Sequence, residues 1–226
     1  MTQAPGIAKT GSGGQKPLMA RPPAPAPSKR AERTRLRLLD SVVDLLSESG
    51  LASVTPAAIA ARAGLARTAY LYHFPDRPAL LAALAPHLRE GMARLFDAAG
   101  RPPPGIDASD HAIDTYWALL FEPPFLAFAE LRSAARADPE VAGAIEDLLA
   151  DFDSGRLGGR FGAVAQAGED PRFQTSRDLG RFLLEGLARG GLSYDADDRR
   201  RRLIAVVKRA VHGLNRKGAA QDLWPG

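Results

Sequence analysis

Hydrophobic residues recur along most of this chain at steps of three and four, which is the spacing of one buried stripe on an α-helix. The first such stretch covers residues 29–49, where Leu36, Leu39, Val43 and Leu46 predict one buried face. No stretch shows the alternation of apolar and polar residues that a half-buried strand requires. The pattern therefore predicts an all-α fold.

Local start signals divide the rest of the pattern into further helices. Thr55 and Asp138 are each followed by proline, so a capping side chain precedes a residue that suits the first helical position. The run GRPPPG at residues 100–105 predicts a loop. We expect helices at residues 56–63, 66–72, 77–99, 108–121, 124–137, 139–153, 172–189 and 196–214, with a short helical piece ending near Gln166.

Composition divides the chain into three parts. Residues 1–27 consist mainly of Pro, Gly, Ala, Ser and Thr, with almost nothing to bury, which predicts a disordered tail. Residues 28–75 hold the first three predicted helices, and residues 76–226 hold the others. We expect a small N-terminal domain followed by a larger helical domain.

The segment from Thr55 to Arg77 predicts two short helices joined by a tight turn. Gly64 stands where a left-handed residue would close the first helix, and Pro75 prevents the second from continuing. A helix-turn-helix of this kind holds its second helix against a surface. The outward groups of that helix are a guanidinium, a hydroxyl and aromatic rings with polar tips, which can donate to phosphates and base edges. An alanine-rich helix pair within an all-α core is the alternative interpretation.

Basic residues gather in the same part of the chain. The first 72 residues carry ten Lys and Arg and four acidic residues, whereas the whole chain has a formal net charge of +4. Lys29, Arg30, Arg33 and Arg37 lie early in a predicted helix, where cations oppose the helix dipole. A phosphate would offset that cost, so these side chains are candidates for contacts with a DNA backbone. An ordinary solvated surface is the alternative.

Three pieces of sequence occur together and in a specific order: SESGL at the end of the first helix, then VTPAAIAARAGL, then HFPDRPALL. With them, the segment from about Arg30 to Leu84 resembles the DNA-binding domain of the tetracycline-repressor (TetR) family. The resemblance implies a transcriptional repressor that a small-molecule effector releases from a palindromic operator in double-stranded DNA. The chain departs from the family pattern at Ala66, where Ser is usual, and at Tyr70-Leu71, where Leu-Tyr is usual.

The motif and the resemblance together predict which residues touch DNA. Arg77 enters the set only through the resemblance, which implies a phosphate near the first turn of the helix at 77–99. The tyrosine that touches phosphate in the family is out of register here, so either Tyr72 or a slightly rotated helix would make that contact. The predicted DNA-contacting residues are Lys29, Arg30, Arg33, Thr55, Arg67, Thr68, Ala69, Tyr70, Tyr72, His73 and Arg77.

Aromatic residues are densest between residues 114 and 132. At helical spacing they either fill a core or line an apolar cavity in which a few polar groups, Glu130 among them, orient a ligand. The resemblance implies an effector pocket in this part of the chain. The predicted pocket residues are His111, Tyr116, Trp117, Phe121, Phe125, Phe128 and Arg132.

The last two predicted helices carry apolar residues and several glycines that permit close helix approach. The resemblance implies that they form a four-helix bundle with the same helices of a second subunit. Two-fold symmetry would then present two helix-turn-helix units to a palindromic operator. The predicted interface residues of this homodimer are Leu179, Phe182, Leu183, Leu187, Leu203, Val207 and Val211.

Other classes of function have less support. The chain has four His and no Cys, and it lacks both the HExxH metal motif and a glycine loop for phosphate, so we expect no enzyme, no metal and no cofactor. No run approaches the roughly 20 apolar residues that span a bilayer, which predicts a cytoplasmic protein without a membrane partner. A helical scaffold whose helix-turn-helix no longer reads DNA is the alternative to a regulator.

Overall fold

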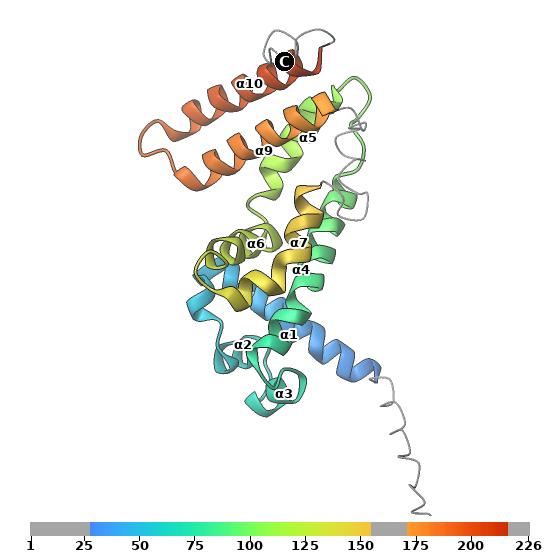
Figure 1. Ribbon diagram of the computed structural model, residues 1–226, viewed down its shortest axis with the longest axis vertical. Helices are drawn as coiled ribbons and strands as arrows, with labels where there is room; N and C mark the ends of the chain where they lie inside the picture. The colour runs from blue at the N-terminus through green and yellow to red at the C-terminus, as the bar shows by residue number, and fades with distance from the viewer. Residues whose placement is uncertain (1–27, 155–170, 217–226) are drawn as a thin grey trace, which may run out of the picture.

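The computed structural model describes residues 28–154 and 171–216, and all regular structure in these ranges is helical (Figure 1). In chain order the elements are α1 (Lys29–Ser49), the short 3-10 turn η1 (Leu51–Ser53), α2 (Pro56–Arg62), α3 (Arg67–His73), α4 (Arg77–Ala99), α5 (Ala108–Leu119), α6 (Pro123–Ala134), α7 (Pro139–Asp153), α9 (Pro171–Gly190) and α10 (Ala196–Asn215). The predicted all-α fold is confirmed. No helix within these ranges combines the length and apolar character that crossing a membrane requires. The predicted tail at 1–27 and the helical piece ending near Gln166 lie outside the described residues.

Side-chain caps fix where several helices begin. The Thr55 hydroxyl accepts a hydrogen bond from a backbone amide of α2 at 3.2 Å, and the Asp76 carboxylate accepts one from an amide of α4 at 2.8 Å. Each cap satisfies an amide that has no partner within its own helix. Ser28 and Asp138 cap α1 and α7 in the same way. The helix starts predicted at residues 29, 56, 77 and 139 are confirmed.

The helices form an elongated molecule (Figure 1). α1, α2 and α3 lie at one end, and α9 and α10 lie side by side at the other. α4 leads away from the helix-turn-helix end with α7 alongside it, while α6 packs against α1, α4 and α7. α5 packs against both α9 and α10. α4 therefore connects the helix-turn-helix end to the rest of the fold.

The buried face of α1 differs from the predicted stripe at its start. Leu39, Val43 and Leu46 are buried as predicted, and Leu38 is buried beside them. Leu36 is 40% exposed, so its predicted burial is wrong. The physical reason is that the first turns of α1 project past the neighbouring helices, and only the later turns meet a partner surface (Figure 1).

A carboxylate from α6 holds the turn that follows α1. Glu130 accepts a hydrogen bond from the Leu51 amide at 3.1 Å. Gly50, which ends α1, has a φ of +74°, and a Cβ at this position would lie 2.9 Å from Glu130 Oε1. The backbone conformation therefore favours glycine here, and a side chain would also have to displace the Glu130 carboxylate. Glu130, which the sequence suggested as a ligand-orienting group, braces the helix-turn-helix end against α6.

Replacing Leu88 with alanine tests the buried face of α4. Leu88 is fully buried, so Leu88→Ala should lower the free energy of unfolding by about 2–5 kcal/mol through lost burial and the cavity left behind. The matched control is Leu36→Ala, which should change it by less than about 0.5 kcal/mol because that side chain is already exposed. Urea denaturation followed by circular dichroism measures both. Equal losses in the two variants would contradict the burial described here.

Candidate functional site

The helix-turn-helix consists of α2, a turn at Gly64 and α3. Gly64 has a φ of +64°, a conformation that residues with a side chain rarely adopt. The Arg37 guanidinium reaches across from α1 and donates to the Ala63 carbonyl at 2.5 Å, which gives this helix-end carbonyl a partner. The predicted glycine turn is confirmed. Arg37, one of the early cations of α1, anchors that turn to α1.

Aromatic packing fixes one face of α3. Tyr70 is 4% exposed, and its ring centroid lies 5.8 Å from that of Phe74. Burial, with a smaller contribution from the Asp76 charge, raises the pKa of the Tyr70 phenol. The Tyr70 ring packs in the core, so the structure does not support the predicted DNA contact of Tyr70. The start of α3 has no side-chain cap, as the alanine at position 66 predicts.

The opposite face of α3 is open to solvent. Arg67 and Thr68 are exposed, and Tyr72 is 80% exposed. Ala69 and His73 are half-buried at the edges of this face. The exposed tyrosine of α3 is therefore Tyr72, two positions after the buried one. A guanidinium, a hydroxyl and a phenol project together from one short helix.

Further cations come from the first turns of α1. Lys29, Arg30 and Arg33 are exposed, and no carboxylate in the described part of the chain pairs with them. Arg62 of α2 differs, because it pairs with Asp44 at 3.3 Å and also with a second carboxylate of α1. An unpaired cation is available to neutralise a phosphate, whereas a paired one must first leave its partner.

Two predicted DNA contacts are engaged within the protein. The Thr55 hydroxyl caps α2. Arg77, in the first turn of α4, donates to Asp138 at 2.6 Å and also to Glu140. These hydrogen bonds raise the pKa of the Arg77 guanidinium and lower the pKa of the Asp138 carboxyl. A phosphate contact by Arg77 would require exchange of these carboxylates for the phosphate.

Ion pairs tie α7 to other helices at both of its ends. At the start of α7, Asp138 and Glu140 hold Arg77 of α4. At its end, Asp153 accepts a hydrogen bond from Arg181 of α9 at 2.7 Å. Each pair has at least one partly exposed partner, so each contributes little to stability. Their main effect is geometric, because through α7 they connect the first turn of α4 to α9.

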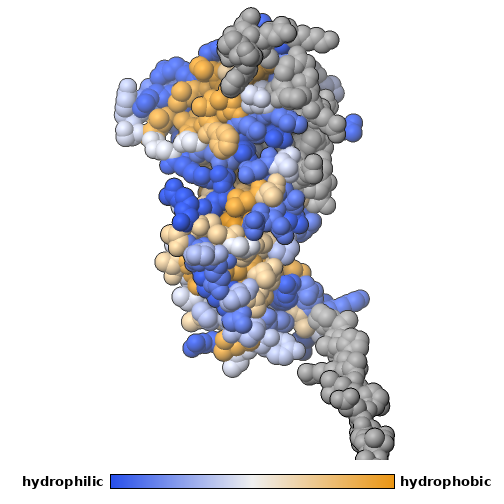
Figure 2. All heavy atoms as spheres, viewed as in Figure 1, coloured by the Kyte–Doolittle hydropathy of each residue, from blue (hydrophilic) through white to orange (hydrophobic). Residues whose placement is uncertain are grey.

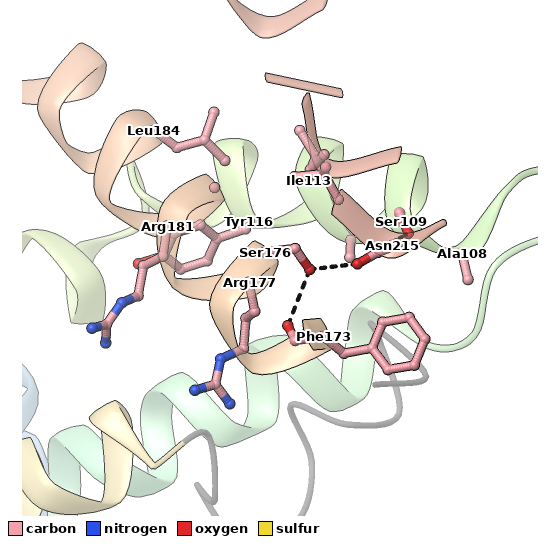
Figure 3. Close-up of a pocket in the computed structure, with 13 residues that line it drawn as sticks. Ala108, Ser109, Ile113, Tyr116, Phe173, Ser176, Arg177, Arg181, Leu184 and Asn215 are labelled. Carbon is pink, nitrogen blue, oxygen red and sulfur yellow. Dashed lines mark hydrogen bonds between the residues drawn. The ribbon is translucent and has the colours of Figure 1, made fainter. Parts of the chain in front are cut away.

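A cavity of about 230 Å³ lies between α5, α9 and α10 (Figure 3). Hydrogen bonds join the three helices on one side of it: Ser176 donates to Asn215 at 2.6 Å, and the Asn215 amide donates to Ser109 at 3.3 Å. The lining residues are Ala108, Ser109, Ala112, Ile113, Tyr116, Phe173, Ser176, Arg177, Gly180, Arg181, Leu184, Val211 and Asn215. Apolar walls with a few polar groups are typical of small-molecule sites.

The predicted pocket residues do not converge on this cavity. Of that set, only Tyr116 is among the lining residues. Phe125 and Phe128 are buried instead, and both rings pack edge to face against Phe152. For these two residues the aromatic-core alternative describes the structure. The other predicted members lie outside the lining, namely His111, Trp117, Phe121 and Arg132.

A buried carboxylate behind the cavity wall escaped the sequence analysis. Glu185 of α9 is 4% exposed, accepts a hydrogen bond from the Tyr116 hydroxyl at 2.8 Å and pairs with Arg132 at 3.0 Å. Burial raises the pKa of Tyr116 well above its usual value, and the Glu185 charge adds to this. The available signal was an acidic residue placed directly after Leu184 on the inward face of α9. The cluster joins α5, α6 and α9.

The outer face of α9 and α10 is apolar. Leu179, Phe182, Leu183 and Leu203 are exposed, as is Val206, which is not among the predicted interface residues. Figure 2 shows apolar side chains gathered over this end of the molecule. The predicted interface members Val207 and Val211 are buried within the chain itself, and Leu187 is half-buried. Contiguous exposed apolar surface of this kind marks an interaction site.

Comparison with known proteins defines the class of protein to which this architecture corresponds. Residues 38–84 match the family model described as bacterial regulatory proteins, tetR family. A transcriptional regulator from Rhodococcus sp. Rha1 is similar in structure, with a TM-score of 0.58 and 19% identity over 79% of this chain and 94% of that one. A search of curated protein sequences finds no significant match.

Two further solved structures have the same fold. A TetR-family member from Streptomyces coelicolor A3 gives a TM-score of 0.54 at 19% identity, covering 80% of this chain and 97% of that one. The multidrug binding protein EbrR, in complex with imidazole, gives a TM-score of 0.54 at 18% identity, covering 80% and 93%. The fold is that of TetR-family transcriptional regulators. Residues 38–84, which hold the helix-turn-helix, match the TetR-family model, as the sequence resemblance predicted.

Removing the Tyr116 hydroxyl tests the buried cluster. Tyr116→Phe should cost about 1–3 kcal/mol of unfolding free energy at neutral pH, because buried Glu185 loses a donor. The pKa of Tyr116 is higher in the folded chain than in the unfolded chain, where it is about 10. The stability that the neutral hydroxyl contributes is therefore complete below this unfolded pKa and is lost as the pH rises above it. Urea unfolding at pH 7 and above pH 10 measures the change. Tyr194→Phe, at an exposed ring, should show neither effect.

Proposed function

We propose that this protein is a homodimeric DNA-binding transcriptional regulator, specifically a repressor that leaves a palindromic operator when a small molecule occupies its larger helical part. The observation that carries the proposal is the outer face of α3, where Arg67, Thr68 and Tyr72 project from a helix held by buried aromatic rings. A rigid helix with exposed donors suits insertion into the major groove. A regulator of this kind would work where the chromosomal DNA is, so the proposal includes a cytoplasmic location.

The unpaired cations at the start of α1 are the proposed phosphate contacts. Lys29, Arg30 and Arg33 have no carboxylate partner among the described residues, so they can neutralise phosphates without breaking an ion pair. Such contacts position the protein on the duplex, while the side chains of α3 read base edges. In this division of roles Arg67 is the main candidate for base recognition, because a guanidinium pairs bidentately with guanine.

We propose that α7 couples effector binding in the cavity to the orientation of the helix-turn-helix. A ligand in the cavity would contact Arg181, whose partner Asp153 ends α7, and the start of α7 holds Arg77 at the beginning of α4. A ligand that favours one arrangement of these pairs shifts the orientation of the helix-turn-helix. Because linkage is reciprocal, DNA and effector should weaken each other's binding by the same factor. EbrR, bound to imidazole in its crystal structure, supports a ligand site in this fold.

The apolar outer face of α9 and α10 is proposed as the homodimer interface. Phe182, Leu183 and Leu203 are exposed there, and burial against a second copy would remove them from water. A two-fold axis through this face would give two α3 helices in one assembly. Two recognition helices related by symmetry require a palindromic site.

Titration with DNA tests the proposal directly. The purified protein is titrated against fragments of its own upstream genomic DNA at two salt concentrations, and one fragment should bind tightly, with affinity falling as salt rises. Arg67→Ala should weaken binding to that fragment by roughly 1–3 kcal/mol if the side chain reads a base. Arg201→Ala removes the same charge from exposed α10 and should have no comparable effect.

The contrary result is equally informative. Weak binding to every fragment, with Arg67→Ala and Arg201→Ala indistinguishable, would reject sequence-specific DNA binding. It would favour the helical scaffold alternative, and a protein partner would then be sought.

Phe182→Glu tests the proposed dimer. Phe182 is 57% exposed, so a carboxylate is tolerated in a lone chain, but it would be buried without a partner in the dimer. Sedimentation equilibrium should show a dimer for the unaltered protein and a monomer for the variant. Leu126→Glu, at an exposed leucine of α6, is the matched control and should remain dimeric. A dimeric Phe182→Glu variant would place the interface elsewhere.

A further inference from the structure

Three metal-ligating side chains from two helices meet at one end of the cavity. Asp107 precedes α5, Asp110 lies in its first turn, and His212 lies near the end of α10. One ligand atom from each of the three lies within 4.8 Å of the others. We propose that these side chains form a binding site for a divalent transition-metal ion, with Zn²⁺ as the reference ion. The proposal is independent of DNA binding.

The distances fit such a site. His212 Nε2 lies 3.0 Å from an oxygen of Asp110 and 3.7 Å from an oxygen of Asp107. Zinc lies about 2.0–2.2 Å from nitrogen and carboxylate ligands, so two ligand atoms of one tetrahedral ion are separated by about 3.3–3.6 Å. The two distances from His212 Nε2 therefore lie within a few tenths of an ångström of those that one tetrahedral ion requires.

The charges also favour a cation. Two carboxylates face one imidazole, and no Lys or Arg in the described ranges pairs with either of them. One turn away, between the same two helices, Asp114 is paired with Lys208 at 2.7 Å. That neighbouring contact is a balanced ion pair of one acid with one base. At the Asp107, Asp110 and His212 cluster the negative charge exceeds what one imidazole can neutralise.

The surroundings hold the ligands in place. The Asp107 carboxylate caps α5 and accepts hydrogen bonds from the Ser109 and Asp110 amides at 2.8 Å and 3.2 Å, which fixes its orientation. Asn215, one turn after His212, bonds to Ser109 and keeps the end of α10 against the start of α5. All three ligands are partly exposed, so an ion can enter from solvent.

The ligand set selects among ions. One imidazole nitrogen and two carboxylate oxygens suit Zn²⁺, Co²⁺ and Ni²⁺, whereas Mg²⁺ and Ca²⁺ prefer oxygen ligands alone. Three protein ligands leave one position of a tetrahedral ion for water. An ion there would join the last turn of α10 to the first of α5 beside Ser109 and Asn215, and so stiffen one end of the cavity.

The test uses the full chain without a histidine tag. Isothermal titration calorimetry with Zn²⁺ should give one saturable site per chain, and Zn²⁺ should raise the Tm. His212→Ala and Asp110→Asn should each weaken this binding by at least about tenfold, since loss of an outer-shell partner alone costs 10–100-fold. Asp107→Ser keeps a capping hydroxyl while removing the carboxylate, and it should weaken binding similarly.

His87→Ala is the matched control, because His87 pairs with a single carboxylate, Asp40, at 2.9 Å. It should leave Zn²⁺ affinity unchanged. Circular dichroism without metal verifies that each variant is folded, and His212→Gln replaces His212→Ala if that variant is not. Three results would each overturn the proposal: no saturable Zn²⁺ binding, binding that survives loss of His212, or equal loss in His87→Ala. The cluster would then be a contact of one imidazole with two carboxylates that holds no metal ion.

Discussion

The continuous burial of one face of α4 is the constraint on which the structure depends. Leu80 and Leu84 belong to the core beneath the helix-turn-helix, and Met92 and Phe96 on the same helix pack among the helices beyond it. Because one unbroken helix serves both regions, the orientation of α3 cannot change without a change along α4. Pro86 lies within α4 without ending it. The helix-turn-helix end is thus attached to the rest of the fold by a packed helix and not by a linker.

Local signals predicted much of this fold. The Ser28, Thr55, Asp76 and Asp138 caps act within one turn, so the starts of α1, α2, α4 and α7 were predictable from neighbouring residues. Burial depends on partners distant in sequence, and the predictions that the structure does not support are of this kind. Leu36 has the right spacing but no helix opposite it, while Tyr70 falls on the inward side of α3.

The candidate sites were less predictable for the same reason. Aromatic residues at helical spacing fit a ligand cavity and a core equally well, and Phe125 and Phe128 fill the core because α4 and α7 cover them. The cavity instead uses Ser176 and Asn215, small polar residues that no local pattern distinguishes. The cluster of Asp107, Asp110 and His212 spans more than 100 residues of sequence, so only the packing of α10 on α5 reveals it.

The pairing of Arg77 with Asp138 and Glu140 has a consequence for counterions. A free cation that meets a phosphate displaces an ion condensed on DNA. If Arg77 exchanged its two carboxylates for a phosphate, the abandoned carboxylates would attract ions from solution and cancel part of that release. The number of ions set free on binding would then reflect the cations that were unpaired beforehand, such as Lys29 and Arg33, and would understate the number of phosphates touched.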